Sequence, residues 1–223
     1  LIVFPKDNKD VMALVKVVAE NKAKYPDLSI TARSAGTCMS GGAVNDSIIM
    51  DFTKHMNQFE GITGDKARVM PGMFYRDFEK QTLKKGMLMP SFPASRDLAA
   101  VGGMVANNSG GEKSLEFGKI LNFVDKLNVV FADGKEYQVG PLNKKQLDKK
   151  LSQKDFEGDI YRKVFKLIDS KYDLIKKAKP KVSKNSMGYN IWDVWDREKE
   201  IFDLSKLIVG SQGTLAIVND LSL

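Results

Sequence analysis

The sequence contains one cysteine, Cys38, and one histidine, His55, among its 223 residues. A single cysteine excludes an internal disulfide framework and a cysteine-rich metal site. A single histidine excludes catalytic schemes that need a histidine pair and metal cages built from several histidines. We therefore expect no bound metal ion, and neither zinc-activated water nor a Ser-His-Asp triad as the chemistry of the chain.

Long apolar runs are also missing, although 43% of the residues are hydrophobic. No run approaches the roughly 18 residues that a membrane-spanning helix needs. The first five residues are too short for the apolar region of a signal peptide, and no basic segment precedes them. Because the chain starts without methionine in an expected strand, we interpret its start as a boundary within a longer protein. We expect a cytoplasmic or peripherally membrane-associated protein with no integral membrane segment.

Positive charge exceeds negative charge, with 35 lysines and arginines against 28 aspartates and glutamates and a formal net charge of +7. Much of the excess lies in clustered lysines, namely Lys144, Lys145, Lys149, Lys150, Lys176, Lys177, Lys179, Lys181 and Lys184. Such clusters can bind nucleic acid by neutralising phosphates. However, no aromatic side chains that could stack on bases interleave with the lysines of residues 144–154. We interpret the lysines as a solvated helical face and expect no nucleic-acid partner.

The spacing of apolar residues predicts a small α/β unit with parallel strands at the start of the chain. Its expected elements are a strand over residues 1–4, a helix over residues 9–21 capped by Asp7 or Asn8, and strands over residues 28–33 and 48–52. The later expected elements are a strand over residues 67–70, a helix over 74–85, a hairpin of residues 124–132 and 135–139, a helix over 159–171, and strands over 207–209 and 214–218. Asp133-Gly134 supplies the positive φ angles of a tight hairpin turn, and the lysine-rich residues 142–157 are expected to form a peripheral insert.

Two loops rich in glycine carry the candidate chemistry, residues 33–43 directly after a strand and residues 101–111. Glycine allows positive φ angles and a close approach of the backbone to a ligand. Consecutive backbone N–H groups in such turns can cradle phosphate oxygens. One such loop is more often an ordinary surface loop, but two in one chain favour nucleotide binding. Neither loop fits the Walker phosphate loop or the Rossmann pattern of glycines with a later acidic residue.

Four segments resemble, in the right order, the FAD-binding domain shared by relatives of vanillyl-alcohol oxidase and p-cresol methylhydroxylase. Residues 33–43 are similar to the R-G-G-G-T-S-x-x-G pyrophosphate loop of the glycolate oxidase and D-lactate dehydrogenase branch, and residues 93–103 to its P-x-S-x-x-x-A-T-I-G-G segment. Residues 107–111 with Phe117-Gly118 resemble its N-x-G-G with a later Tyr-Gly, and residues 210–218 resemble G-S-E-G-T-L-G-I-I. The resemblance spans almost the whole chain.

This resemblance implies an α+β fold of two lobes with FAD extended between them. A small parallel α/β lobe would cover about residues 1–65, and a larger, mainly antiparallel sheet lobe with helices about residues 66–223. The first loop and the Gly102 region would hold the pyrophosphate. The residues that the resemblance places on FAD are Arg33, Ser34, Ala35, Gly36, Thr37, Cys38, Gly41, Gly42, Pro93, Ser95, Ala99, Gly102, Gly103, Ala106, Asn107, Asn108, Gly110, Gly111, Gly118, Gly210 and Ile217.

Several positions depart from the pattern of this branch. Its glycines are replaced by Ser34 and Ala35, and Met104 stands where it has asparagine. Relatives with a covalent flavin carry histidine where Thr37 stands here, which implies non-covalent FAD. Other departures are Cys38, Ala100, Gln212 and Ala216, in place of serine, threonine, glutamate and glycine.

The function implied is an FAD-dependent oxidoreductase that oxidises a 2-hydroxy acid of the D-lactate or glycolate type by hydride transfer to FAD. A further C-terminal domain, absent from this chain, would supply the substrate contacts, and the electron acceptor is unknown. No catalytic residue is assigned. One alternative is another member of the superfamily, of the cell-wall precursor reductase or alkyl-glycerone-phosphate synthase type. Another is a degenerate, non-catalytic nucleotide-binding module, suggested by Ala35, Ala100 and Met104.

Four other residues invite a functional reading. The branch often has Gly-Tyr at the position of Tyr189, which could approach the flavin ring. For Trp192 and Trp195, packing in the core or between the lobes is the favoured interpretation. For His55 an exposed loop position is favoured over a catalytic base.

Overall fold

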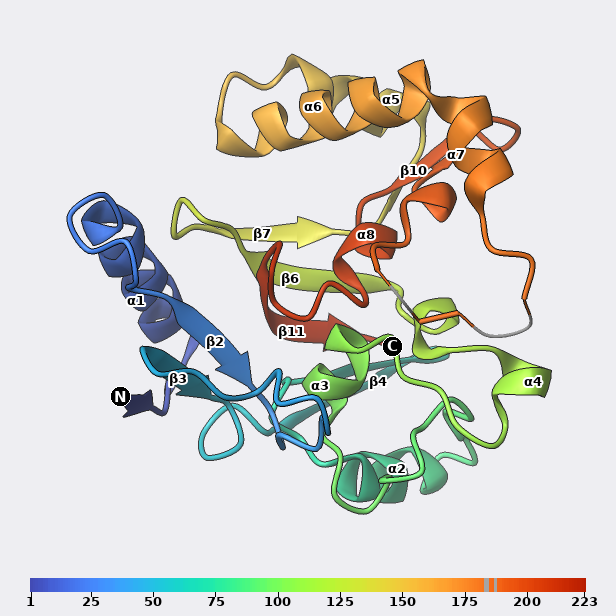
Figure 1. Ribbon diagram of the computed structural model, residues 1–223. Helices are drawn as coiled ribbons and strands as arrows, with labels where there is room; N and C mark the ends of the chain where they lie inside the picture. The colour runs from blue at the N-terminus through green and yellow to red at the C-terminus, as the bar shows by residue number, and fades with distance from the viewer. Residues whose placement is uncertain (183–184, 187) are drawn as a thin grey trace.

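The structure is a computed structural model that describes residues 1–182, 185–186 and 188–223, so Lys184 of the lysine clusters lies outside the described residues. The elements in chain order are β1 (Ile2–Val3), α1 (Asn8–Asn21), β2 (Ile30–Arg33), β3 (Ile48–Asp51), β4 (Phe59–Thr63), β5 (Lys66–Val69), α2 (Tyr75–Leu83), α3 (Val101–Ala106), α4 (Ser114–Phe117), η1 (Ile120–Asn122), β6 (Lys126–Val130), β7 (Glu136–Val139), β8 (Pro141–Leu142), α5 (Lys144–Ser152), α6 (Phe156–Ser170), α7 (Tyr172–Ala178), η2 (Ile191–Asp193), β9 (Trp195–Asp196), β10 (Ile201–Asp203), α8 (Ser205–Ile208) and β11 (Ile217–Ser222). They build one small lobe and one large lobe (Figure 1).

The small lobe is a parallel three-stranded sheet in the order β1-β3-β2, with α1 beside it (Figure 1). Helix α1 begins where the sequence predicts, because the side chain of Asp7 accepts hydrogen bonds from the N–H groups of Lys9, at 2.8 Å, and Asp10, at 3.1 Å. These bonds satisfy donors that have no partner within the helix. The parallel pairing expected for this part of the chain is confirmed.

The large lobe is built on an antiparallel sheet in the order β4-β5-β11-β6-β7. Its last strand in sequence, β11, lies at the centre, between two strands from much earlier in the chain. Side chains alternate between the two faces. In β6, for example, Leu127 and Val129 are fully buried in the main core, while Asn128 and Val130 lie on the opposite face, where Val130 is buried against the small lobe. One face of the sheet therefore holds the main core, and part of the other face packs against the small lobe.

A layer of helices α5, α6 and α7 covers one side of the large lobe, next to the small antiparallel sheet β8-β10-β9 (Figure 1). Asn143 caps α5 in a capping box, in which its side chain and that of Gln146 each accept a hydrogen bond from the other residue's N–H group. Leu147 and Tyr161 are fully buried beneath this layer. The residues expected as a peripheral insert thus form helix α5, at the outer edge of the molecule in Figure 1.

The predicted α+β class with a parallel lobe and a larger, mainly antiparallel lobe is confirmed, but some elements differ. Residues 207–209, expected as a strand, lie in and directly after α8. Asp203 bonds the N–H and hydroxyl groups of Ser205 and thereby sets the start of that helix. The last strand covers residues 217–222 rather than 214–218, and β4 was not expected. In the β6–β7 turn only Gly134 has a positive φ, of 72°.

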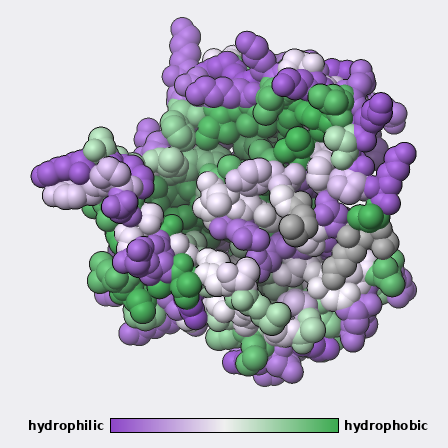
Figure 2. Space-filling model, viewed as in Figure 1, coloured by the Kyte–Doolittle hydropathy of each residue, from purple (hydrophilic) through white to green (hydrophobic). Residues whose placement is uncertain are grey.

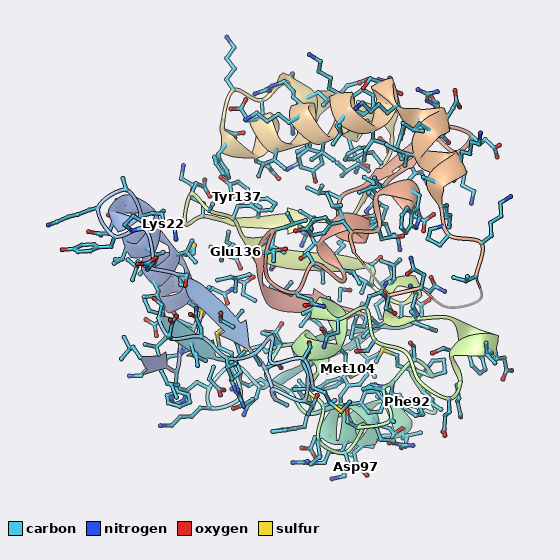
Figure 3. All side chains as sticks on the ribbon, viewed as in Figure 1. Lys22, Phe92, Asp97, Met104, Glu136 and Tyr137 are labelled. Carbon is cyan, nitrogen blue, oxygen red and sulfur yellow. The ribbon has the colours of Figure 1, made fainter. Side chains whose placement is uncertain are left out.

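The expected lobe boundary near residue 65 falls inside the β4–β5 hairpin of the large sheet. We therefore propose that the lobes divide within residues 52–58, which follow β3. Across this division an apolar cluster joins the lobes, made of Val11, Val15, Met50, Phe52, Met56, Val130 and Ile217. A polar contact adds to it, since Glu136 (Figure 3) accepts a 2.7 Å bond from the side chain of Asn8 and another from that of Asn219.

Within the part of the chain that the structure describes, no helix combines the length and the apolar character that crossing a membrane requires.

The Pro71-Gly72 turn packs tightly against the segment between the lobes. The N–H of Gly72 donates to the carbonyl of Met56 at 2.8 Å. A Cβ atom on Gly72 would lie 2.5 Å from the carbonyl carbon of Phe52 and 2.7 Å from the carbonyl oxygen of Met56. Only glycine fits here, because both neighbours are backbone and cannot turn away.

We predict that Gly72→Ala lowers the free energy of unfolding by about 3 kcal/mol, through this overlap with the backbone. Gly64→Ala is the control for a glycine replaced without overlap, because its Cβ would meet open space and only its φ of 63° is unfavourable. The control should lose only about 1–2 kcal/mol from the left-handed backbone. Urea unfolding followed by circular dichroism measures both, and equal losses would contradict the packing argument.

Candidate functional site

A groove runs between the two lobes and contains about 820 Å³ of open space, its solvent-exposed part included. Three segments line it: the loop after β2 with Ala32, the region of α3, and the stretch from α8 to β11. The lining residues are Ala32, Arg33, Ser34, Ala35, Gly36, Thr37, Cys38, Gly42, Ala43, Phe52, Pro71, Ala100, Gly102, Gly103, Ala106, Asn107, Ile208, Ser211, Gln212, Gly213, Ala216 and Val218. The groove thus starts at the carboxyl end of a parallel strand, where open α/β sheets bind their ligands.

The first segment is shaped by Arg33, the last residue of β2. Its guanidinium donates to the carbonyl of Ala43 at 3.2 Å, and its Nε lies 3.7 Å from a carboxylate oxygen of Asp51. It also lies against Gly36, where a Cβ atom would come within 2.5 Å of the guanidinium carbon. Gly36 has a φ of 69°, a backbone conformation that favours glycine, and a larger residue here would also displace the Arg33 guanidinium. Arg33 therefore fixes the curvature of the loop from inside.

The first loop tolerates Ser34 and Ala35 in place of glycines because neither has a positive φ. The hydroxyl of Ser34 donates to the carbonyl of Pro71 at 2.7 Å and so ties the loop to the large lobe. Among the described residues, no partner accepts from the N–H groups of Ala35, Gly36 or Thr37. These three consecutive donors can serve a ligand in the groove.

The second segment is the short helix α3. Gly102 donates to the carbonyl of Pro71 at 2.9 Å, and a Cβ on Gly102 would lie 2.5 Å from the Cβ of Pro71. Gly103 faces the other way, with its Cβ position 3.4 Å from the Cβ of Ser34. Its N–H has no acceptor within the described chain. The first glycine thus packs α3 onto the turn, and the second leaves room between α3 and the first loop.

The third segment is fastened to the end of α3. The N–H of Gly210 donates to the carbonyl of Val105, and that of Gln212 to the carbonyl of Ala106, both at 3.0 Å. These bonds satisfy carbonyls that the end of a helix leaves free. Across the groove, a Cβ on Gly42 would lie 3.8 Å from the side-chain oxygen of Gln212. The loop of residues 210–214 therefore closes one end of the groove beside the first loop.

Cys38 lies in the first loop with its Sγ 2.9 Å from the hydroxyl oxygen of Ser40. Hydrogen bonds lower the pKa of the thiol, first from the Ser40 side chain and then from the N–H groups of Ser40 and Gly42. Donors converge on this side chain because the loop curls around it. The same convergence makes the loop suited to negatively charged groups.

Some residues expected on FAD lie outside the groove and support its walls. A Cβ on Gly111 would lie 3.2 Å from the carbonyl carbon of Phe92, so this glycine packs against backbone. The buried Asn108 accepts from the N–H of Leu121 at 3.3 Å, and Ile217 belongs to the apolar cluster between the lobes. The expected residues outside the groove lining are Gly41, Pro93, Ser95, Ala99, Asn108, Gly110, Gly111, Gly118, Gly210 and Ile217.

Other lining residues were not among those expected. Ser211, Gln212, Gly213 and Ala216 lie inside the 210–218 motif, so the motif itself was the signal that could have identified them. Ala32, Ala43, Ala100 and Val218 adjoin expected residues or motif ends. Phe52, Pro71 and Ile208 come from segments with no glycine-rich motif, and only the folded chain brings them to the groove.

The departure at Met104 does not touch the groove. Met104 is 1% exposed and lies in the main core with Phe92, beside α2 (Figure 3). The helix turns its glycines toward the loop and the Pro71-Gly72 turn, and its methionine toward the core. This substitution therefore leaves the lining unchanged.

Four residues weighed in the sequence have defined places. Trp195 is buried against Phe165 and Phe202, and Trp192 packs against the same core, which confirms the packing interpretation. His55 is half-buried in the segment after β3 and is not part of the groove lining. Tyr189 is 45% exposed, and its hydroxyl lies 2.8 Å from that of Thr214, beside the loop that closes the groove.

FAD suits the residues present. The groove offers a lining of glycine and other small residues, N–H groups without an acceptor in the described chain on two segments, and one charged side chain, Arg33. Such neutral donors hold a pyrophosphate without a basic cluster. In the described ranges, no group of three or more histidine, cysteine, aspartate or glutamate side chains could hold a metal ion.

Comparisons with known proteins agree with this geometry. The sequence model of the FAD binding domain family matches residues 1–140. D-2-hydroxyglutarate dehydrogenase of Escherichia coli (strain K12) is 29% identical over 222 residues, which cover 98% of this chain and 22% of the relative. D-lactate dehydrogenase of Archaeoglobus fulgidus is 26% identical over 221 residues, covering 98% and 37%. Glycolate oxidase subunit GlcD of Bacillus subtilis is 25% identical over 223 residues, covering 98% and 35%.

Solved structures share the fold. Matches at 17% identity include 6-hydroxy-D-nicotine oxidase from Arthrobacter nicotinovorans, with a TM-score of 0.63 over 100% of this chain and 35% of that one. An alkyldihydroxyacetonephosphate synthase matches with a TM-score of 0.62 over 99% and 33%. The chain thus spans between a fifth and two fifths of the length of these curated relatives and solved structures.

We predict that Ser40→Ala raises the pKa of Cys38, because the Ser40 hydroxyl gives the largest stabilisation of the thiolate. The rate of alkylation by iodoacetamide depends on the thiolate fraction, so its pH profile should move to higher pH. Cys38 is the only cysteine, which makes the label specific. Ser152→Ala, at the exposed end of α5, is the control and should leave the profile in place. An unmoved profile in the Ser40 variant would refute the assignment.

Proposed function

The chain belongs to the FAD-binding domain family, and from this premise we propose that it is the FAD-binding part of an oxidoreductase that oxidises a 2-hydroxy acid. The observation that carries the proposal is the groove between the lobes, whose lining of small residues includes N–H groups of the first loop and of α3 that have no acceptor in the described chain. The substrate class is supported by the matched relatives, whose names specify D-2-hydroxyglutarate, D-lactate and glycolate.

In this proposal the pyrophosphate of FAD lies between the first loop and α3. The N–H groups of residues 35–37 and of Gly103 donate to its oxygens, and Arg33 holds the loop in shape. Thr37 cannot form the covalent link that a histidine forms at this position, so FAD is bound without one. The expected residues that lie outside the groove act through the lining, by packing its walls.

FAD, when bound, supplies the hydride acceptor for oxidation of the substrate. The contribution of this chain is to hold and orient it. Closing the groove between two lobes also removes water from the charged pyrophosphate, which strengthens each hydrogen bond to it. Tyr189, whose hydroxyl lies 2.8 Å from that of Thr214 beside the loop that closes the groove, would contact the flavin ring in this proposal.

Substrate handling is proposed for another part of a longer protein. The described groove offers Arg33 as its only charged side chain, and this guanidinium is already engaged with Ala43 and Asp51. A substrate carboxylate and the proton of its hydroxyl group need further charged groups, which a second domain would supply. The electron acceptor of such a protein is not assigned, and its expected cytoplasmic or membrane-peripheral location stays a prediction.

The alternative of a degenerate module that has lost FAD is less well supported. Met104 points into the core, and Ala35 has no positive φ, so these departures leave the groove intact. The alkyldihydroxyacetonephosphate synthase type shares the fold at 17% identity, which supports the architecture alone.

We predict that the purified protein binds FAD and that Gly103→Asp weakens this binding at least about tenfold, because a carboxylate would face the pyrophosphate. Gly103→Asn, of nearly the same size without the charge, should lose clearly less. Gly64→Asp, in an exposed turn, is the control for a new carboxylate elsewhere. Flavin absorbance after purification and fluorescence titration with FAD measure the effect. Wild-type protein that neither carries nor binds FAD would refute the proposal.

We also predict that FAD protects Cys38 from iodoacetamide. At about ten times the dissociation constant of FAD the alkylation rate should fall about tenfold, in proportion to the free protein. Riboflavin, which lacks the pyrophosphate, is the matched ligand control and should protect less. If FAD binds but Cys38 reacts at its original rate, the pyrophosphate does not lie along the first loop.

A further inference from the structure

The whole net charge of the protein lies in one layer. Residues 143–181, which contain helices α5, α6 and α7, hold 13 lysines and arginines against 6 aspartates and glutamates, a net charge of +7. The rest of the chain holds 22 residues of each sign and is neutral. Figure 2 shows hydrophilic surface along the upper edge of the molecule, where Figure 1 places α5 and α6. The molecule therefore has a strongly electropositive side.

Most of these positive charges lack a carboxylate partner. Four of the 13 form ion pairs, namely Lys144 with Asp148, Lys150 with Glu157, Arg162 with Asp159 and Lys179 with Asp193. Within residues 143–181, all of which are described, no ion pair is found for the other nine, which are Lys145, Lys149, Lys154, Lys163, Lys166, Lys171, Lys176, Lys177 and Lys181. All of them except the half-buried Lys176 are exposed. They can pair with an external polyanion at little desolvation cost.

Exposed leucines lie among these lysines. On α6, Lys163, Lys166 and Leu167 are spaced by three and four residues and so share one face. Leu167 is 53% exposed, and Leu174 on α7, next to Lys171 and Lys177, is 64% exposed. Leucines in these positions do not contribute to the core. They give the cationic side an apolar component that a purely solvated face would not need.

We propose that the face of α6 and α7 around Lys163, Lys166, Leu167, Leu174 and Lys177 docks on the anionic surface of a phospholipid membrane. Lysines attract the anionic headgroups, and the two leucines enter the boundary between headgroups and acyl chains. Lysine suits such a surface because its long stem lets the ammonium reach the headgroup level while the helix lies flat.

Other polyanions fit these residues less well. Single-stranded nucleic acid is held by several aromatic side chains that stack on successive bases, whereas this layer exposes one ring, Phe156, and Tyr172 at the start of α7 is covered by Arg197, 4.1 Å from its ring centre. An acidic protein would bind this face through ion pairs with the lysines, and the exposed leucines would then have no role. Docking through this face also leaves the groove accessible, since the groove lies between the lobes, away from α6 and α7 (Figure 1). The proposal is independent of flavin binding.

The test is co-sedimentation of the full-length protein with vesicles of phosphatidylcholine alone and of phosphatidylcholine mixed with phosphatidylglycerol. We expect binding only to the mixed vesicles, with loss of binding at high salt. The variant Lys163→Glu/Lys166→Glu/Lys177→Glu should bind at least about tenfold less. The variant Lys9→Glu/Lys84→Glu/Lys85→Glu makes the same change in net charge on α1 and beside α2, and should bind almost as the wild type does.

The leucines separate a lipid surface from a soluble polyanion. Leu167→Ser/Leu174→Ser keeps every charge and should still weaken vesicle binding severalfold. Circular dichroism and thermal unfolding establish that each variant is folded. Absence of wild-type binding to the mixed vesicles, equal loss in the two triple variants, or retention on heparin or DNA without vesicle binding would each overturn the proposal.

Discussion

The carbonyl oxygen of Pro71 joins the two glycine-rich segments of this protein. It accepts the hydroxyl of Ser34 from the small lobe and the N–H of Gly102 from α3. The neighbouring Gly72 is held against the backbone of Phe52 and Met56. The first loop, α3 and the segment between the lobes therefore all contact this one turn.

This arrangement explains which glycines the motifs can lose. The family pattern has consecutive glycines after Arg33, yet this chain keeps only Gly36, where φ is positive and the guanidinium lies within contact. At Ser34 the hydroxyl, which a glycine would lack, donates a hydrogen bond to the carbonyl of Pro71 in the large lobe. In α3, Gly102 is required by the Pro71-Gly72 turn, whereas Gly103 lies against Ser34 of the first loop. Glycines that look equivalent in the sequence therefore have separate physical reasons.

Local signals predicted much of the fold. The cap at Asp7 and the Asp133-Gly134 hairpin turn act within a few residues, and both are present in the structure, with a positive φ at Gly134 but not at Asp133. The apolar run at Leu207 was misread, because a short run fits a strand or a buried helix equally well. The place of β11 in the sheet and the presence of Phe52 and Pro71 in the groove depend on contacts between distant segments. No pattern in a single sequence reports those contacts, whereas the motif resemblance indicated the segments of the groove.

The central position of β11 has a consequence for the order in which the protein acquires structure during synthesis. Strands β5 and β6 leave the ribosome long before residues 217–222, and each keeps an unpaired edge until β11 enters between them. Exposed strand edges are the usual starting points for aggregation. The small lobe, whose strands β1, β2 and β3 lie within the first quarter of the chain, can assemble early. The β5 and β6 edges therefore stay open while the residues between β6 and β11 are synthesised, and chaperone contact during this interval would fall on these two edges.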